Sequence, residues 1–560
     1  MKQPASLTWP VPMRVMAWTD DGIVQIGMLP DRAPATYPEH WYIEPTQDLH
    51  GYLGDVVAMM QQEHIPGLSL VGQSHVPLEK LTALPELKAL VLDDTDADLT
   101  KLTLDLDRLY VERVAIEDVN AVVAKLPHLQ VLDLDGVEMH DTTAIAGLTE
   151  LRALDLGHTQ ITDRDGAMLG ALTKLEILDL AHTKIGAQTI AAIRPLALRE
   201  LFIEGTMVGK EVATLDGYAP GIVRFDASDL MSEYRPTDRD VAWLAQAPNL
   251  VEVGLGHAKV HDALALQIFA LPGLKEVRFA DTEITKVPIA ALAKRTEMRE
   301  IDLGGTPVTD EPAKAMIAFP ELRMLRLDST KITDAAFTGV VPSSKLVELY
   351  VSGTDVTDLG MAVLSQLPDL RGLGVGTTKV KDATVERISH LDQLRTLVMS
   401  KVKVENTALI GRLAKLQRLY LDDCFVDDSM VAAFAKLTKL RALHLENTSV
   451  GEGSIAVLNT FTQLEELTVG DTYFGDTALK LDLPRLHTLS LVGLQIDDAH
   501  LQPALAHLAP VVELDLSATE VKDPSALLAL TKLKVLGLAQ TKVAPDVAKR
   551  FTARGVDVKM

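Results

Sequence analysis

The sequence predicts an α/β solenoid in which short parallel strands alternate with short helices. Two observations carry this prediction. The apolar residue that opens each unit recurs at six successive intervals of 24 residues between Leu250 and Leu394. Within the unit Met298–Pro320, apolar residues stand at positions 1, 4, 6 and 11, with Thr at 9 and Asp at 13. A fixed period of this length is typical of stacked repeats.

About 21 repeats, mostly of 22–25 residues, follow this frame. They open at Ile65, Leu87, Leu106, Leu129, Leu151, Leu175, Leu198, Ile222, Leu250, Leu274, Met298, Leu322, Leu346, Leu370, Leu394, Leu416, Leu440, Leu464, Leu486, Val511 and Leu533. Positions 4 and 6 are expected to point into the core, and the strands that carry them to stack into one parallel sheet. Unbroken repeats predict one elongated body, which solution scattering would test.

The limits of the repeat array predict that the chain has three parts. Residues 1–64 are interpreted as an N-terminal cap, residues 65–544 as the repeat array with an irregular insertion near 231–240, and residues 545–560 as a C-terminal cap. In the first part, a β-hairpin is expected around the turn sequence Thr19-Asp20-Asp21-Gly22, followed by an amphipathic helix. The alternative is that this part is a separate recognition module.

The frame L-x-x-L-x-L-x-x-T-x-I, repeated over about Ile65 to Val543, resembles the leucine-rich repeat family. It is similar to the bacterial class with Thr or Cys at position 9 and short convex helices. The resemblance implies a right-handed solenoid with a curved parallel sheet on its concave face and a role in protein binding. It implies no reaction.

Composition narrows the function classes. The formal charge is 54 minus 78, or −24, which disfavours a nucleic-acid partner because phosphate contacts need clustered Lys and Arg. No apolar run reaches the length of a membrane span, and the N-terminus lacks a signal-peptide pattern, so we expect a cytoplasmic protein without a membrane partner. A monomer is favoured. The single cysteine, Cys424, excludes an internal disulfide framework.

Acidic residues recur at position 13: Asp141, Asp163, Asp262, Asp310, Asp334, Asp358, Asp382, Asp428, Asp476, Asp498 and Asp523. Each is expected to accept the free N–H groups in the first turn of its own helix. The Thr at position 9 is expected to satisfy backbone groups where the chain leaves each strand. Cys424 occupies the same position, which favours a buried ladder residue over a nucleophile.

The residue at position 5 of each repeat is expected to face the concave side. In the repeats from Tyr350 to Tyr420, these residues predict a groove that binds a partner. Tyr350 and Tyr420 flank a strand whose Gly372, Gly374 and Gly376 are expected to face outward, and a strand that exposes Val398. Outward glycines often mark the close approach of another backbone, and tyrosine is enriched in binding hot spots. The alternative is that glycine is merely tolerated on a sheet stabilised by its neighbours. The insertion adds Tyr234 and Arg235 as candidate contacts.

A second stretch of position 5 is acidic. Asp133, Asp155 and Asp179 are expected to stack on neighbouring strands, with His158 and His182 nearby at position 8. Adjacent like charges call for a metal ion or a basic side chain, so Asp155, His158, Asp179 and His182 are weak metal candidates; the alternative is solvated aspartates. Further along, Arg278, Asp302 and Arg326 alternate in sign and are interpreted as a self-satisfied ladder.

The sequence lacks the common catalytic and nucleotide-binding signatures, and Gly372-x-Gly374-x-Gly376 lies within a strand instead of opening a helix. We therefore predict a non-catalytic, cofactor-free scaffold that binds another protein on its concave face. The first alternative is an effector or ubiquitin-ligase adaptor that recognises substrates through the array. The second is a metal-dependent enzyme at the acidic stretch.

Overall fold

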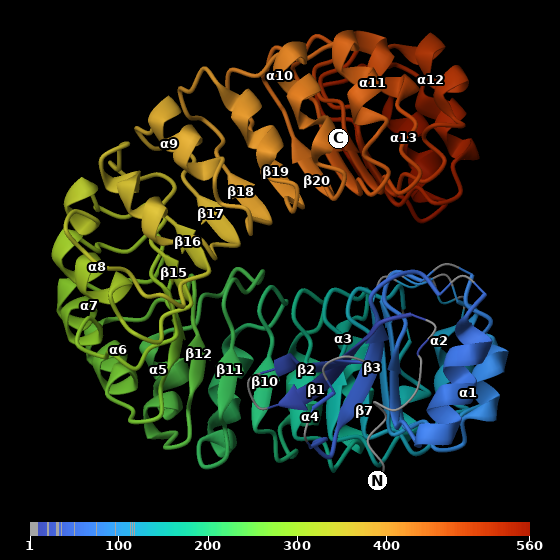
Figure 1. Cartoon of the computed structure of the whole chain (residues 1–560), viewed down its shortest axis with the longest axis vertical. Helices are drawn as coiled ribbons and strands as arrows, with labels where there is room; N and C mark the ends of the chain where they lie inside the picture. Colours follow the sequence, from blue (N-terminus) through green and yellow to red (C-terminus); the bar gives the residue numbers. More distant parts are fainter. Residues whose placement is uncertain are drawn as a thin grey trace. The chain divides into compact units, whose positions relative to one another are not determined.

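The computed structural model describes residues 9, 11–19, 22–29, 33–34, 36–49, 51–73, 75–93, 95, 97–112, 114, 116, 118–139 and 141–560. The chain divides into two compact units, Met1–Glu283 and Ile284–Met560 (Figure 1). The boundary falls within regular repeats and not at the insertion near residue 234. Each unit is a mainly parallel sheet with short helices along one face.

Unit 1 contains thirteen described strands and six α-helices. The strands are β1 Met13–Thr19, β2 Gly22–Leu29, β3 Trp41–Pro45, β4 Gly67–Ser69, β5 Ala89–Asp93, β6 Arg108–Glu112, β7 Val131–Asp133, β8 Ala153–Asp155, β9 Ile177–Asp179, β10 Glu200–Phe202, β11 Arg224–Asp226, β12 Glu252–Gly254 and β13 Glu276–Arg278. The α-helices are α1 Leu53–Glu63, α2 Val119–Val123, α3 Asp163–Gly166, α4 Ala187–Ile193, α5 Asp238–Val241 and α6 Asp262–Phe269. The 3-10 helices are η2 Leu78–Ala83, η3 Leu99–Lys101, η4 Ile145–Gly147, η5 Ala167–Ala171, η6 Lys210–Tyr218 and η7 Ala242–Gln246.

Unit 2 is built in the same way. Its strands are β14 Glu300–Asp302, β15 Met324–Arg326, β16 Glu348–Tyr350, β17 Gly372–Gly374, β18 Thr396–Val398, β19 Arg418–Tyr420, β20 Ala442–His444, β21 Glu466–Thr468, β22 Thr488–Ser490, β23 Glu513–Asp515, β24 Val535–Gly537 and β25 Asp557–Lys559. Its α-helices are α7 Lys286–Leu292, α8 Asp310–Ile317, α9 Asp382–Ile388, α10 Asp428–Ala433, α11 Ile455–Leu458, α12 Asp498–Ala504 and α13 Pro545–Thr552. Its 3-10 helices are η8 Asp334–Ala336, η9 Gly360–Gln366, η10 Thr407–Arg412, η11 Phe434–Lys436, η12 Glu452–Ser454, η13 Gly475–Lys480 and η14 Pro524–Ala529.

The strands pair in register, so each position of the repeat forms a row across the sheet. At position 4, for example, Leu132 lies beside Leu154, which lies beside Leu178, and all three are at most 1% exposed. Because successive strand residues point to opposite faces, position 4 packs against the helices while positions 3 and 5 face outward. The predicted solenoid and its core positions are confirmed.

The N-terminal segment continues the sheet of unit 1. Strand β1 pairs antiparallel with β2 and with β3, and β3 pairs with β4, so the predicted hairpin is present. Its Asp20-Asp21 turn lies outside the described residues. The Trp18 ring stacks on Tyr110 of β6 at 5.3 Å, and α1 buries Val56 and Met60 as predicted. The segment's role as a cap stays a prediction.

The threonines of position 9 form the predicted ladder. In Thr159, Thr183, Thr206, Thr282, Thr306, Thr330, Thr354, Thr378, Thr448, Thr472, Thr519 and Thr541, the hydroxyl donates to the carbonyl of position 6 in the same repeat. Cys424 is 5% exposed, and its Sγ lies 3.1 Å from the carbonyl oxygen of Met399. Burial raises the pKa of this thiol to about 11, so it stays protonated at neutral pH.

The aspartates of position 13 mostly cap the following repeat, and the prediction that each caps its own helix is wrong for these residues. Asp163 accepts the N–H groups of Gly186, Gln188 and Thr189, at 2.8 to 2.9 Å. Bonds to the next repeat recur at Asp310, Asp334, Asp358, Asp382, Asp428 and Asp498. The physical reason is that parallel strands about 4.8 Å apart bring the next turn directly beside the carboxylate. Asp141 and Asp523 do bond within their own turns.

Asp334→Ala is expected to lower the free energy of unfolding by roughly 2–4 kcal/mol, because buried donors left without an acceptor each cost about 1–3 kcal/mol. The carboxylate accepts the N–H and hydroxyl of Thr357 and the N–H of Gly360, at 2.7 to 2.9 Å. Urea unfolding followed by circular dichroism measures this loss. Asp355→Ala is the matched control, because its carboxylate is 66% exposed and forms an ion pair with the equally exposed Lys379, and such surface pairs contribute little to stability. Equal stability of the two variants would contradict the capping role.

Candidate functional site

We use the term sheet face for the side of each sheet that carries positions 3, 5 and 7 of the repeats, opposite the helices. In unit 1, Asp133, Asp155 and Asp179 lie side by side at position 5 of β7, β8 and β9. We call these three residues the acidic column. The structure therefore brings together the carboxylates that the sequence placed on neighbouring strands.

Each carboxylate of the acidic column also has a local structural bond. Asp133, Asp155 and Asp179 each accept the N–H two residues further along, from Asp135, Gly157 and Ala181, at 2.8 to 3.0 Å. Burial, together with the charges of neighbouring aspartates, raises the pKa of Asp133 and Asp155 to about 7 and that of Asp179 to about 6. At neutral pH, Asp133 and Asp155 are therefore partly protonated, whereas exposed aspartates would be fully ionised.

The backbone conformation explains why histidines occupy the two positions near the acidic column. His158 and His182 have φ values of 53° and 54°, and left-handed residues occur at position 8 in repeat after repeat, including Gly205, His257 and Asn447. Gly, Asn, Asp and His are the residues that adopt this conformation most readily. The recurring Gly and Asn at position 8 were the signal in the sequence that would have revealed this role.

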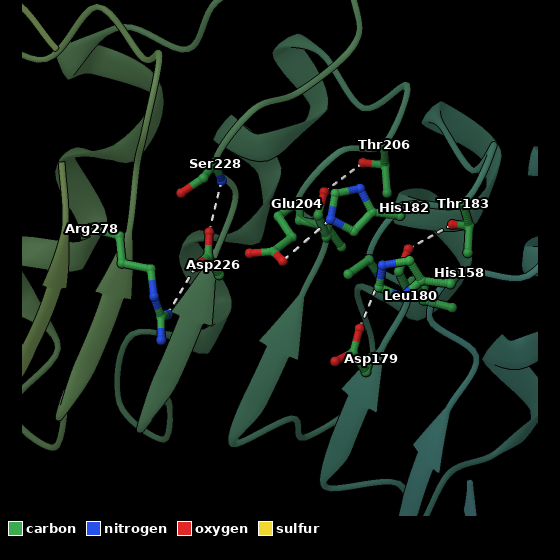
Figure 2. Close-up of polar contacts among 12 residues, drawn as sticks. His158, Asp179, Leu180, His182, Thr183, Glu204, Thr206, Asp226, Ser228 and Arg278 are labelled. Carbon is green, nitrogen blue, oxygen red and sulfur yellow. Dashed lines mark hydrogen bonds and ion pairs between the residues drawn. The ribbon is translucent and has the colours of Figure 1, made fainter. Parts of the chain in front are cut away.

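The histidine rings stack on each other at 4.6 Å, and each bonds a different carboxylate. His158 Nδ1 lies 2.9 Å from Asp135. His182 Nε2 lies 3.5 Å from Glu204, as Figure 2 shows. Among the described residues, no group of three or more His, Cys, Asp or Glu side chains converges as metal ligands would. Asp155, His158, Asp179 and His182 therefore form a polar surface and not a ligand set.

Beyond the column, the sheet face of unit 1 holds a buried ion cluster. Arg278 Nη1 lies 3.1 Å from Asp226, whose side chain is fully buried (Figure 2). Arg278 also bonds Glu252, whose side chain is 5% exposed. Burial, and next the charge of Asp226, raises the pKa of neighbouring Glu204 to about 8. Glu204 and Glu252 occupy positions 7 and 3, which share the sheet face with position 5 because side chains alternate along a strand.

The residues of the predicted ladder belong to different units, because Arg278 lies in unit 1 while Asp302 and Arg326 lie in unit 2. Within unit 1, Arg278 contacts buried carboxylates on the two preceding strands. In unit 2, Arg326 lies 3.5 Å from Asp302, as the alternation of charge predicted for that pair. Arg326 also stacks its guanidinium on the Tyr350 ring at 4.5 Å.

The predicted groove of unit 2 is not bare strand. A Cβ added at Gly372 or Gly374 would lie 2.5 or 2.7 Å from atoms of Tyr350, so the tyrosine side chain lies across these two glycines. Gly376 is buried as well, because the backbone of Ser400 closes over it. The glycines thus make room for neighbouring parts of the same sheet, and the prediction of an open glycine groove is wrong.

Two aromatic rings, held in place by their neighbours, lie on the sheet face here. We call the surface formed by Tyr350 and Tyr420 the tyrosine face. Tyr350 lies over glycines and under Arg326, while Tyr420 packs against His444 at 4.5 Å. Both tyrosines and Val398 between them are half-buried. Burial, followed by the charge of Glu348, raises the pKa of Tyr350 to about 12. His444 lies one strand beyond Tyr420, where the predicted groove ended, and so was not among the predicted contacts.

The insertion lies apart from the tyrosine face in the chain, in unit 1. The Tyr234 hydroxyl donates to Asp240 at 2.6 Å, and the Arg235 guanidinium donates to the carbonyls of His257 and Asp281. The loop borders a cavity of about 400 Å³ together with Asp229 and His257. Tyr234 and Arg235 therefore brace the loop, and their role in partner binding stays a prediction.

Comparison with known families identifies the repeat. The family model described as Leucine Rich repeat matches residues 148–170, which hold β8, the turn at His158 and α3. The same strand register, position-9 ladder and left-handed position 8 extend through the other repeats. The chain is a leucine-rich repeat protein. This fold is typical of protein–protein interaction and is generally a non-enzymatic scaffold.

Solved leucine-rich repeat structures resemble the chain only distantly. An internalin of Listeria monocytogenes is 16% identical over 78% of this chain and 94% of its own, with a TM-score of 0.30. A leucine-rich repeat protein of Leptospira interrogans is 17% identical over 79% of this chain and 99% of its own, with a TM-score of 0.34. The Arabidopsis receptor kinase HAESA, solved with a peptide hormone and a co-receptor, is 15% identical over 86% and 83%, with a TM-score of 0.38.

No curated protein matches the chain. Within the part of the chain that the structure describes, no helix is long and apolar enough to cross a membrane.

Proposed function

We propose that this leucine-rich repeat protein is a non-catalytic scaffold that binds another protein on its sheet face. The observation that carries the proposal is the acidic column of unit 1, three half-buried carboxylates aligned on adjacent strands. Such an arrangement lowers the stability of the free chain, because like charges repel across a sheet. Features that cost stability are characteristic of functional surfaces.

A partner that inserts Lys or Arg side chains between these carboxylates would supply the missing counter-charge. Buried ion pairs formed across an interface are stabilised further when surrounding residues exclude water. The raised pKa values of Asp133 and Asp155 predict that such binding releases protons near neutral pH. We therefore infer a basic segment as the partner of this surface.

The tyrosine face of unit 2 is the second candidate surface, favoured by the bracing of Tyr350 and Tyr420. Side chains already held in one conformation lose little entropy on binding, which is what hot-spot residues need. Whether the scaffold acts as an effector or a ubiquitin-ligase adaptor, and whether it resides in the cytoplasm, stay predictions.

Affinity capture with the intact chain as bait is expected to retain a partner protein, and variants identify the surface. Asp155→Asn combined with Asp179→Asn is expected to reduce partner binding at least tenfold, or about 1.4 kcal/mol, if the column is the interface. Tyr350→Ala combined with Tyr420→Ala would cost roughly 2–4 kcal/mol of binding if the tyrosine face is used. Titration calorimetry with the identified partner measures both losses.

His158→Ala combined with His182→Ala is the matched control for the column, because it changes exposed neighbours without changing its carboxylates. A captured partner whose affinity is unchanged by both the aspartate and the tyrosine variants would contradict binding at the sheet face. An increase in binding with rising salt would contradict a basic partner, because salt screens ionic contacts.

A further inference from the structure

The sheet face of unit 1 carries an apolar row directly beside the acidic column. Val131, Ala153 and Ile177 occupy position 3 of β7, β8 and β9, and the strand register places them side by side. Ile177 is 37% exposed, and the other two residues are half-buried. Positions 3 and 5 of one strand share a face, so the apolar row and the acidic column lie about 7 Å apart. We call these six residues the two-row surface.

The carboxylates of this surface keep the capacity to bond a ligand. The backbone N–H bond that each of them accepts goes to its Oδ1 atom. Among the residues that the structure describes, none donates a hydrogen bond to the Oδ2 atoms. An ammonium or guanidinium group can therefore bond each Oδ2 without displacing the bond that holds the carboxylate in place.

Aromatic side chains lie at both ends of the acidic column. Tyr110 lies beside Asp133 at position 5 of β6, and Phe202 lies beside Asp179 at position 5 of β10. Both aromatic residues are half-buried. Aromatic rings pack against the aliphatic stems of Lys and Arg and against apolar side chains. The acidic contact is therefore limited to three strands, and an aromatic ring extends the surface on either side of them.

The spacing of the strands selects the conformation of a partner segment that crosses them. From the first aspartate of the column to the third, two strand steps cover about 10 Å. In an α-helix, residues i and i+7 lie on one face about 10.5 Å apart, with residue i+4 between them. In an extended segment, three successive residues on one face cover about 13 Å, which exceeds the spacing of the strands. A helix therefore presents one side chain to each carboxylate, and an extended segment does not.

We propose that the two-row surface binds a basic amphipathic α-helix of a partner protein, which lies across β7, β8 and β9. This inference rests on the proposed function, because it specifies the conformation of the basic segment inferred there. Lys or Arg residues at helix positions i, i+4 and i+7 contact the acidic column. Apolar residues at i+1, i+5 and i+8 lie about 100° further round the helix and cover the apolar row. A helix with its side chains is about 10 Å wide, which is enough to contact both rows.

The test is the binding of a synthetic peptide to the intact chain, measured by titration calorimetry at low salt, where ionic contacts are least screened. The peptide consists of three copies of Lys-Leu-Ala-Ala-Lys-Leu-Ala, which places Lys and Leu in adjacent stripes of one helix. The matched control peptide has Pro in place of the fourth residue of each copy, which keeps every charge and every Leu but prevents a continuous helix. Binding of the proline peptide is expected to be at least about tenfold weaker.

Ile177→Asp distinguishes a helix with an apolar stripe from any cation attracted to an acidic surface. The variant adds a carboxylate and removes the most exposed member of the apolar row, so binding of the helical peptide is expected to weaken about fivefold or more. Met168→Asp is the matched control, because Met168 is 41% exposed in η5 on the helix side of unit 1. This variant is expected to bind the peptide as the parent chain does. Circular dichroism verifies that both variants are folded.

Weaker binding of the proline peptide, together with weaker binding by Ile177→Asp, supports the helix. Equal binding of the two peptides, or unchanged or tighter binding by Ile177→Asp, overturns the helix and leaves the proposed basic partner unaffected. If neither peptide binds, the helix and the basic partner at the acidic column are both overturned. Equal losses for Met168→Asp and Ile177→Asp overturn the assignment of the helix to this surface.

Discussion

Replacing Arg278 by Met is expected to lower the free energy of unfolding of unit 1 by about 3–5 kcal/mol at neutral pH, because removing one partner of a buried ion pair leaves a buried charge uncompensated. Asp226 is fully buried and Glu252 is 5% exposed at the side chain, and Arg278 contacts both. Glu252 keeps Arg224 at 3.0 Å. The largest part of the loss therefore comes from Asp226.

All four tryptophans, Trp9, Trp18, Trp41 and Trp243, lie in unit 1, so tryptophan fluorescence during urea unfolding reports on this unit. Arg152→Met is the matched control. Its guanidinium is 59% exposed and pairs with a half-exposed Glu176, so a loss of less than about 1 kcal/mol is expected. Lowering the pH protonates the abandoned carboxylates and is expected to recover part of the loss for Arg278→Met. A loss equal to the control's would show that the cluster does not stabilise unit 1.

The second large effect is a decrease in the stability of unit 1 as the pH rises from about 5 to about 8. The folded-state pKa values of Asp133, Asp155 and Asp179 are raised to about 7, 7 and 6, and that of Glu204 to about 8. A carboxyl whose pKa is raised by folding binds its proton more tightly in the folded state. Its contribution is therefore fully present at low pH and is lost as the pH rises through the folded-state pKa.

Asp155→Asn is expected to raise the free energy of unfolding at the alkaline end of this window by about 1–3 kcal/mol, since one pKa unit corresponds to about 1.4 kcal/mol and the site is partly solvated. The amide oxygen of Asn can still accept the Gly157 N–H that the carboxylate accepts at 2.8 Å. The variant is also expected to flatten the pH dependence of tryptophan-monitored unfolding.

Asp141→Asn is the matched control for the column. Bonds from Thr143 hold the pKa of Asp141 below its usual range, so the sign of its contribution is opposite and no stabilisation is expected. If Asp155→Asn lowered stability at alkaline pH as well, repulsion within the acidic column would not be a significant cost. The argument for a basic partner at this surface would then lose its support.

The position of the acidic column was predicted from the numbering of residues within each repeat. Position 5 of consecutive repeats must lie on adjacent strands, and Asp133, Asp155 and Asp179 do so. The sequence also indicated that Thr and Cys424 share one buried slot. These features depend on the repeat length and on the alternation of side chains along a strand. Both can be determined from the amino-acid sequence without the structure.

The reasons for several residues depend instead on contacts between repeats. His158 and His182 looked like ligands until their left-handed backbone explained them, and Gly374 looked like an open groove until the Tyr350 ring lay across it. Asp334 caps the next repeat and not its own. Each of these assignments requires knowing which atoms of a neighbouring repeat come within hydrogen-bonding or van der Waals distance, and a single repeat does not contain that information.

By itself the sequence determined the class of fold, the core positions and the face on which charge accumulates, because burial of one apolar residue in every repeat enforces the period. The tertiary structure alone decided the partners of each polar group. Arg278 contacts Asp226 and Glu252 on the two preceding strands, where a guanidinium is stabilised because these carboxylates are buried. Side-chain reach across strands of a sheet sets such choices, and it is a property of distances in space.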